Sequence, residues 1–328
     1  MKYKIIAMLL CVSMCFGVTA CGGGEAPEET TSTEKAASVS NNKLDNESVV
    51  ISVGKTTVKY NEFLAYYYFM KNPYEGILGS EVWNYKKAST SGKTLGQEAV
   101  EAVLRLIIQV KVICKEAALQ KVTLGTDEKE QASHSAKTLC DSLKEEIKQK
   151  NGLDVATVTR IFEENKLAQK MYHIEIGKVD ANLTAEQVKA ARVQLIFWNA
   201  DDKNRAEVKK KAEQVHQSLV NAQGNFYTVA KNNTEAAEIE TFVGGSDERT
   251  NLAKAALSLK RGAISNVIEE KDGFYIAYCV APSSKEIEEQ YRNQVLLKKQ
   301  TQAFQKAYLD WSDEFEVKVS KALLIDKK

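Results

Sequence analysis

The sequence has few of the residues from which metal centres, disulfide frameworks and catalytic triads are built. Its 328 residues include three histidines and six cysteines. Three cysteines lie in the first 21 residues, and the others form no close-spaced pair: Cys114, Cys140 and Cys279. This odd, scattered set argues against a disulfide framework or a zinc site. The histidines stand in lysine- or glutamate-rich helical segments, so we expect ordinary helix residues at His134, His173 and His216. We therefore expect no metal and no cofactor.

An excess of charge of one sign is also lacking. Lysine and arginine number 45 against 44 aspartates and glutamates, which gives a formal net charge of +1. A near-neutral chain has no electrostatic reason to bind nucleic acid, or to hold anionic lipid through a polybasic patch. The N-terminal apolar run, residues 5–18, is too short to span a bilayer.

What the N-terminus does contain is typical of an export signal. Lys2 and Lys4 precede the apolar run, and small residues lead up to Cys21. Residues 18–21, Val-Thr-Ala-Cys, are followed by three glycines and resemble a bacterial lipobox, in which the cysteine is diacylated and the preceding bond is cut. An ordinary signal peptide or a poor transmembrane helix is the alternative. The resemblance implies a lipoprotein signal over residues 1–21 and lipid attachment at Cys21, which would anchor the protein to the cell membrane on its extracytoplasmic side.

Residues 22–47 are rich in Gly, Glu, Ser, Thr and Asn and contain almost no large apolar side chains. Such a segment buries too little surface to offset the entropy lost on folding. We expect a flexible tether here.

The rest of the chain predicts an α+β protein of two domains. Two short alternating segments flank a turn at Gly54, and long helical patterns follow at residues 61–71, 96–120, 127–150 and 154–175. A further helix, predicted at 285–315, needs an apolar surface to lie on. The N-terminal helices offer one, and residues 315–319 then alternate as a strand that could pair near Val50.

We therefore expect a mainly helical domain made of residues 48–183 and 284–328, with a small domain of residues 184–283 inserted in it. The opening strand, glycine turn and strand before Glu62 resemble the chaperone domain of secreted foldases related to SurA and PrsA. The interrupted layout is known in that family.

The inserted segment resembles the parvulin-type, or PpiC, prolyl isomerases. The resemblance is carried by Ala-Arg-Val-Gln-Leu-Ile-Phe at 191–197, Gly-Asn-Phe at 224–226, Leu-Ser-Leu-Lys-Arg-Gly-Ala-Ile-Ser at 257–265 and Asp-Gly-Phe-Tyr-Ile at 272–276. It implies a small antiparallel-sheet domain that grips proline in an apolar slot beside two hydrogen-bonded histidines. Isomerisation crosses a barrier of about 18 to 20 kcal/mol.

When the family's functional positions are transferred to this sequence one by one, the residues found there differ from those of the family. The two histidine positions fall on Gln194 and Tyr275, the methionine position on Glu248 and the phenylalanine position on Leu252. Leu257 and other frame positions match. We therefore expect no confident catalytic residue and a degenerate site, with Leu252 and Leu257 left to bind substrate. In the alternative interpretation, Gln194 and Tyr275 hydrogen-bond each other and hold the sheet together.

Aromatic residues concentrate near the start of the helical domain. Residues 66–69, Tyr-Tyr-Tyr-Phe, cannot all lie on one face of a helix, because successive side chains point about 100° apart. Exposed rings would suit tolerant binding of unfolded chains. The candidate binding residues are Tyr66, Tyr67, Phe69, Tyr74 and Trp83. The alternative is that these rings pack beneath the returning C-terminal helix.

Together these patterns predict a lipid-anchored extracytoplasmic foldase or chaperone that assists unfolded exported polypeptides, with weak or no isomerase activity. An active prolyl isomerase with an atypical site is the alternative. A solute-binding lipoprotein is a more distant one, and would require two lobes built on parallel sheets. The sequence leaves open whether the chain forms a homodimer.

Overall fold

The structure is a computed structural model, which describes residues 44–86, 92–222 and 225–325. The expected signal, Cys21 and the tether up to residue 43 lie outside the described residues. The chain folds into two compact units. The first unit combines the described residues up to Lys178 with those from Thr301 onward, and the second is Val179–Gln300. The fold class is α+β, with a helical unit made from both ends of the chain and a smaller unit between them.

The helical unit contains a three-stranded antiparallel sheet in the order β2-β1-β7. Its strands are β1 (Val49–Val53), β2 (Thr56–Lys59) and β7 (Val317–Val319). β7 pairs with β1 through Ile51 and Val319, so residues from the two ends of the chain share one sheet. The predicted pairing of the terminal strand near Val50 is confirmed.

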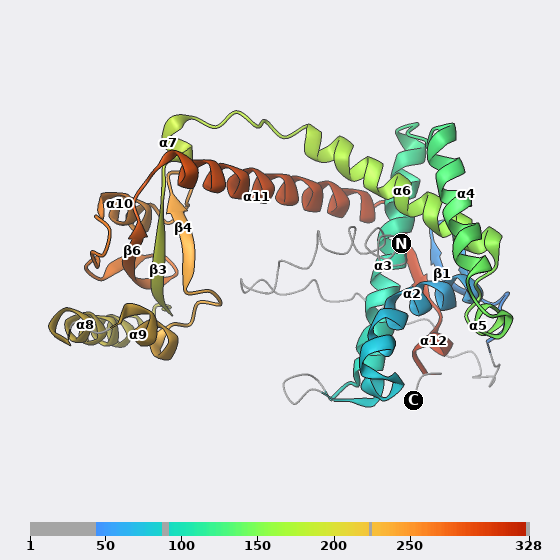
Figure 1. Ribbon diagram of the computed structural model, residues 1–328, viewed down its shortest axis with the longest axis horizontal. Coiled ribbons are helices and arrows are strands. Elements are labelled where there is room, and N and C mark those ends of the chain that lie inside the picture. Colours follow the sequence, from blue (N-terminus) through green and yellow to red (C-terminus); the bar gives the residue numbers. More distant parts are fainter. Residues whose placement is uncertain (1–43, 87–91, 223–224, 326–328) are drawn as a thin grey trace. The chain divides into compact units, whose positions relative to one another are not determined.

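Helices supply most of this unit (Figure 1). They are α2 (Tyr60–Leu78), the 3-10 helix η1 (Ser80–Asn84), α3 (Leu95–Leu119), α4 (Thr126–Asp141), α5 (Glu145–Lys150), α6 (Val155–Gly177) and α12 (Lys321–Ile325). The single helix predicted at 127–150 is two helices. α4 ends at Asp141, and the next residue, Ser142, donates a hydrogen bond from its hydroxyl to the Leu139 carbonyl. Such side-chain bonds to the local backbone compete with continuation of a helix.

The core of the helical unit forms where the apolar faces of α2, α3 and α6 meet the sheet. Val100, Val103 and Ile107 of α3 are among its buried residues, as their three- and four-residue spacing predicted. The last part of α11 (Lys285–Ser312) adds Phe304 and Trp311. Leu44 also packs against this core, so the folded unit includes the last residues of the segment predicted as a tether.

The second unit is built on a four-stranded antiparallel sheet in the order β4-β3-β6-β5. Its elements are α7 (Ala185–Val188), β3 (Ala190–Asn199), α8 (Arg205–Ala222), α9 (Phe226–Asn233), β4 (Glu240–Gly244), α10 (Thr250–Ser258), β5 (Ile268–Glu270) and β6 (Gly273–Ala281). The first part of α11 packs against it through Ile287, Tyr291 and Val295. Both sheets of the described residues are antiparallel, which excludes the parallel-sheet lobes of a solute-binding lipoprotein.

The two faces of the four-stranded sheet carry separate cores. One face, called here the α10 face, packs Val193, Leu195 and Tyr275 against Leu252 and Ala256 of α10. The opposite face, called here the α8/α9 face, packs Ile196, Trp198, Phe274 and Ile276 against α8 and α9. Figure 1 shows these helices around the long strands β3 and β6. Successive residues of one strand therefore face different cores.

Gly273 shows why the turn into β6 needs glycine. Its φ of 149° is one that other residues rarely adopt, and a Cβ atom there would lie 2.0 Å from the Trp198 carbonyl oxygen. The close approach lets β6 run directly beside β3. The sequence motif at 272–276 therefore has a steric basis.

No helix in the part of the chain that the structure describes combines the length and the apolar character needed to cross a membrane.

Candidate functional site

The α10 face is where the resemblance places proline-binding chemistry. β3 contributes Ala191, Val193, Leu195 and Phe197 to it, all of them apolar. Tyr275 and Ala277 come from the neighbouring strand β6. The only histidine of residues 191–281 is His216, which lies on α8, against the other face. No imidazole of the described unit therefore faces α10.

Tyr275 is the centre of the polar groups that remain there. Its ring stacks on Phe197 with centroids 4.6 Å apart, and its hydroxyl donates a hydrogen bond of 2.6 Å to Asp272 Oδ2. The Arg249 guanidinium lies 5.3 Å from the Tyr275 ring centroid. Arg249 is held in turn by a two-pronged contact with Asp247, at 2.8 Å from Nε and 2.6 Å from Nη2.

Electrostatics keep this hydroxyl protonated. Burial raises the pKa of Tyr275 well above its usual value, and the nearby Asp272 reinforces the shift while Arg249 opposes it. The hydroxyl is therefore a hydrogen-bond donor at ordinary pH. It is committed to a carboxylate and not aimed at an open site.

Leu252, predicted to bind substrate, is fully buried between α10 and the sheet, so its side chain is not accessible to a ligand in this structure. Its backbone N–H donates to Glu270 Oε1 at 2.8 Å, and the Asn251 side chain donates to the Glu269 carbonyl at 3.0 Å. These two bonds tie the start of α10 to β5. The leucine fills the core beneath a fixed helix, which closes the position to a proline ring.

Gln194 does not meet Tyr275. The register of β3 and β6 pairs Gln194 with Tyr278 and Phe197 with Tyr275, so the two predicted positions point to opposite faces of the sheet. The Gln194 side chain donates to Glu240 Oε2 at 3.2 Å instead. The alternative of a Gln194 to Tyr275 hydrogen bond is therefore wrong. The resemblance predicts where each residue lies along its strand. It does not predict which face of the sheet the side chain occupies, because a shift of one residue in the alignment moves the side chain to the other face.

The remaining transferred positions are peripheral. Glu248 is exposed at the entry to α10, in an exposed ion pair with Lys298 at 3.4 Å. Leu257 is half-buried on α10 and is absent from the apolar cluster around Leu252. Neither side chain joins the group around Tyr275.

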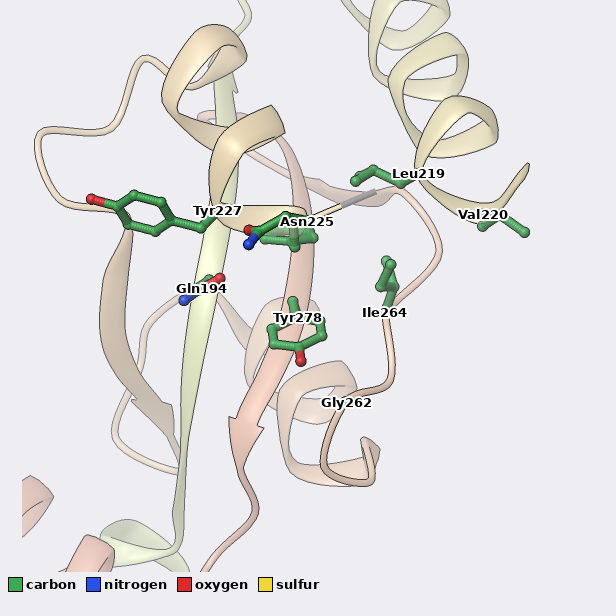
Figure 2. A pocket seen from close by; sticks show the side chains of 9 residues that line it. Gln194, Leu219, Val220, Asn225, Tyr227, Gly262, Ile264 and Tyr278 are labelled. Atoms are coloured by element: carbon green, nitrogen blue, oxygen red, sulfur yellow. The ribbon is translucent and has the colours of Figure 1, made fainter. Parts of the chain in front are cut away.

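The α8/α9 face contains a cleft of about 680 Å³ (Figure 2). Its lining residues come from β3, α8, α9, β6 and the Gly262 turn: Gln194, Leu219, Val220, Asn225, Phe226, Tyr227, Gly262, Ile264 and Tyr278. Sequence reasoning named only Gln194 among them, and for another role. The volume falls in the range of ligand-binding clefts, about 300 to 1,000 Å³.

The aromatic cluster of the helical unit is mostly core. Tyr66, Tyr67 and Phe69, predicted to bind unfolded chains, are buried, so these rings are not accessible to a second chain in this structure. Tyr66 accepts a hydrogen bond of 3.0 Å from Asn165 of α6, and Phe69 contacts Phe162 of the same helix. Two of these rings therefore contact α6, a helix that neither interpretation of the sequence named.

Two of the predicted rings remain accessible. Tyr74 is 50% exposed and meets the half-buried Trp83 edge-to-face at 6.0 Å. Ile77, Leu78 and Tyr85 near them are also exposed, so an apolar patch lies at the end of α2 and around η1. Ile77 and Leu78 were not predicted from the sequence. The signal was the four-residue spacing from Tyr74 to Leu78, which places these two side chains on the same face of a helix.

Comparisons with known proteins agree with the sheet architecture of the second unit. Residues 191–281 match the family model described as rotamase, PPIC-type PPIASE domain. The expected parvulin resemblance is therefore confirmed for this segment. A comparison with curated proteins finds no match.

Among solved structures, the chain is similar to several foldases and chaperones. The peptidylprolyl isomerase PrsA of Bacillus anthracis is 16% identical, over 62% of this chain and 96% of that one, with a TM-score of 0.38. A SurA-like chaperone of Campylobacter jejuni is 8% identical, over 83% and 99%, with a TM-score of 0.32. Foldase PrsA of Streptococcus pneumoniae is 18% identical, over 84% and 96%, with a TM-score of 0.29. At these TM-scores the whole-chain likenesses support no conclusion about function.

Proposed function

We propose that this protein is an extracytoplasmic foldase or chaperone, anchored to the cell membrane by a lipid on Cys21, whose parvulin-like domain has little or no isomerase activity. Its substrates are unfolded or partly folded exported polypeptides. In this proposal, residues 1–21 are the signal, 22–47 the tether with its last residues from Leu44 joined to the folded unit, 48–183 with 284–328 the chaperone domain and 184–283 the parvulin-like domain.

The composition of the α10 face is the observation that carries the proposal. The domain keeps the sheet and turns of a prolyl isomerase family, yet the β3 residues in the core of this face, Ala191, Val193, Leu195 and Phe197, are all apolar. Of the polar groups beside it, the Tyr275 hydroxyl is bound to Asp272 and the Arg249 guanidinium to Asp247. Stabilising a twisted imide requires polar groups aimed at the substrate, and a committed hydroxyl supplies little of that.

The helical unit supplies the second element of the proposal. Its patch of Tyr74, Ile77, Leu78 and Tyr85 leaves large apolar side chains in water. Such surfaces suit tolerant contact with unfolded chains, because apolar contact needs little sequence complementarity. We propose that Tyr74 and Trp83, with this patch, contact client polypeptides.

An active isomerase with an atypical site is the second candidate. The Arg249 guanidinium against the Tyr275 ring favours it, because both groups carry donors close to the place where family members act. Tyr275→Phe separates the candidates, since it removes the hydroxyl and keeps the ring that stacks on Phe197. Loss of turnover in this variant would favour catalysis.

The test is suppression of aggregation. The full chain, mixed with a chemically unfolded test protein, should reduce light scattering in proportion to its concentration. Tyr74→Asp with Leu78→Asp should weaken that protection, whereas Leu309→Asp, an equally exposed leucine elsewhere in the helical unit, should not. Absence of protection by the wild-type chain would refute the chaperone proposal.

For the anchor, Cys21→Ala should release the chain from the membrane fraction, and full retention would contradict lipidation.

A further inference from the structure

We propose that the cleft on the α8/α9 face is a peptide-binding site distinct from the family's proline site. It takes an extended, uncharged polypeptide segment that carries a large apolar side chain. The inference deepens the proposed function, because it gives the parvulin-like domain a way to hold clients without turning over proline.

The cleft offers an apolar slot. Leu219 at the end of α8 and Phe226 at the start of α9 are buried in its walls, and Ile264 closes one side. The Phe226 ring stacks on Tyr278 with centroids 5.4 Å apart, which makes a continuous aromatic surface. Such a surface favours apolar side chains of many shapes.

Two further apolar side chains lie at the edge of the cleft and remain in water. Val220 is 57% exposed and Tyr227 is 49% exposed. In Figure 2 they project from α8 and from the start of α9, on either side of Asn225. A bound segment would cover both, and that burial would add to affinity.

Amides supply the polar contacts. The Asn225 side-chain oxygen Oδ1 accepts a hydrogen bond of 3.3 Å from Thr228 N, which caps α9, while the side-chain NH2 has no partner among the described residues. Gln194 uses its own NH2 for Glu240, and Figure 2 shows its oxygen on the side of Tyr278. One amide donor and one amide acceptor are what the N–H and C=O groups of an extended backbone require.

The absence of charge defines the ligand further. None of the nine lining residues is Asp, Glu, Lys, Arg or His. The nearby carboxylate of Glu240 is bound by Gln194 and by Arg192 at 3.4 Å. A charged segment would lose water without gaining a partner in the cleft, so a neutral segment is favoured.

The site is separate from the α10 face. Gln194 and Tyr278 face the cleft, whereas Tyr275 lies on the opposite face of the sheet, in the cluster with Leu252 of α10. Binding in the cleft therefore needs neither a proline nor the hydroxyl of Tyr275. This separation allows the inference to be tested with a peptide that lacks proline.

The experiment measures binding to the full chain by fluorescence anisotropy. The probe is a labelled, end-blocked peptide of glycine and serine with a central Leu-Tyr-Leu. Val220→Asp combined with Tyr227→Asp places two carboxylates at the rim, at exposed positions where folding should be unaffected. We expect Kd to rise about tenfold, or about 1.4 kcal/mol. Leu297→Asp, a leucine equally exposed on α11 and outside the cleft, should change Kd less than twofold.

A photoreactive benzoylphenylalanine at the centre of the same peptide gives a second readout. We expect cross-links at the end of α8, the start of α9 or Ile264. Equal affinities in both variants, cross-links confined to other sites, or no binding to the wild type would each overturn the inference. If the protein suppresses aggregation but the peptide does not bind in the cleft, the cleft inference is refuted and the chaperone proposal stands. Peptide in the cleft with no protection would instead refute the chaperone proposal.

Discussion

At the residue scale, the helical unit depends on a group of charges buried between α2, α3 and α6. Lys111 Nζ lies 2.7 Å from Glu62 Oε1 and 2.6 Å from each oxygen of Glu164. Arg160 completes the group at 2.9 Å from Glu62 Oε2. The Lys111 and Glu62 side chains are 3% and 2% exposed. Because both have left water, each needs its partner.

Lys111→Met should therefore destabilise the helical unit by about 3 kcal/mol, since it leaves Glu62 buried beside Arg160 alone. Urea unfolding followed by circular dichroism measures the loss. The matched control is Lys170→Met, which breaks a half-exposed ion pair with Glu128 at 2.9 Å and should cost less than about 1 kcal/mol. Equal losses in the two variants would contradict a special role for the buried charges.

Residue patterns predicted the apolar side of this core better than its polar side. Spacing along α3 identified Val103 and Ile107 correctly, because burial follows helical periodicity. The same pattern treats Lys111 and Glu62 as solvent-facing, since their burial depends on partners from other helices. The faces of Gln194 and Tyr275 were likewise beyond the sequence, because they depend on strand register.

At the scale of elements, β7 joins the C-terminal segment to the start of the chain. Gly54 N donates to the Glu316 carbonyl and Ser320 N donates to the Val50 carbonyl, each at 2.8 Å. In an antiparallel pair these bonds alternate with residues whose N–H groups point outward. Lys318, opposite Ser52, therefore directs its N–H to β1, and Val317 directs its N–H away.

Lys318→Pro should consequently lower the free energy of unfolding of the helical unit by about 3 kcal/mol, because it removes a ladder hydrogen bond. Val317→Pro is the control on the same strand and should have a much smaller effect. Thermal unfolding of both variants provides the comparison. If proline were tolerated equally at the two positions, the register of β7 would be wrong.

Elements with strong periodicity were predictable, and short ones were less so. The helices α3, α6 and α11 lie within a few residues of their expected bounds. β4 was missed because its five residues, Glu-Thr-Phe-Val-Gly, are only partly buried at the edge of the sheet. A half-exposed edge strand lacks the regular alternation that identifies a strand from sequence.

At the scale of the whole molecule, the chain leaves the helical unit, folds the parvulin-like unit and returns. α11 takes part in both cores, through Tyr291 in one and Phe304 in the other. The layout was predictable because a long amphipathic helix after a compact domain needs a second apolar surface. Which rings would stay exposed was not predictable, since α6 covers Tyr66 and Phe69 through contacts distant in sequence.

Prolyl isomerisation by the full chain tests the central claim most directly. Exchange spectroscopy on an alanine-leucine-proline peptide measures the cis to trans rate with and without the protein, and a parvulin that has both histidines serves as the positive control. We expect exchange at the uncatalysed pace of tens to hundreds of seconds, under conditions where the same protein suppresses aggregation. Exchange as fast as in the control parvulin, and lost in Tyr275→Phe, would contradict a degenerate site.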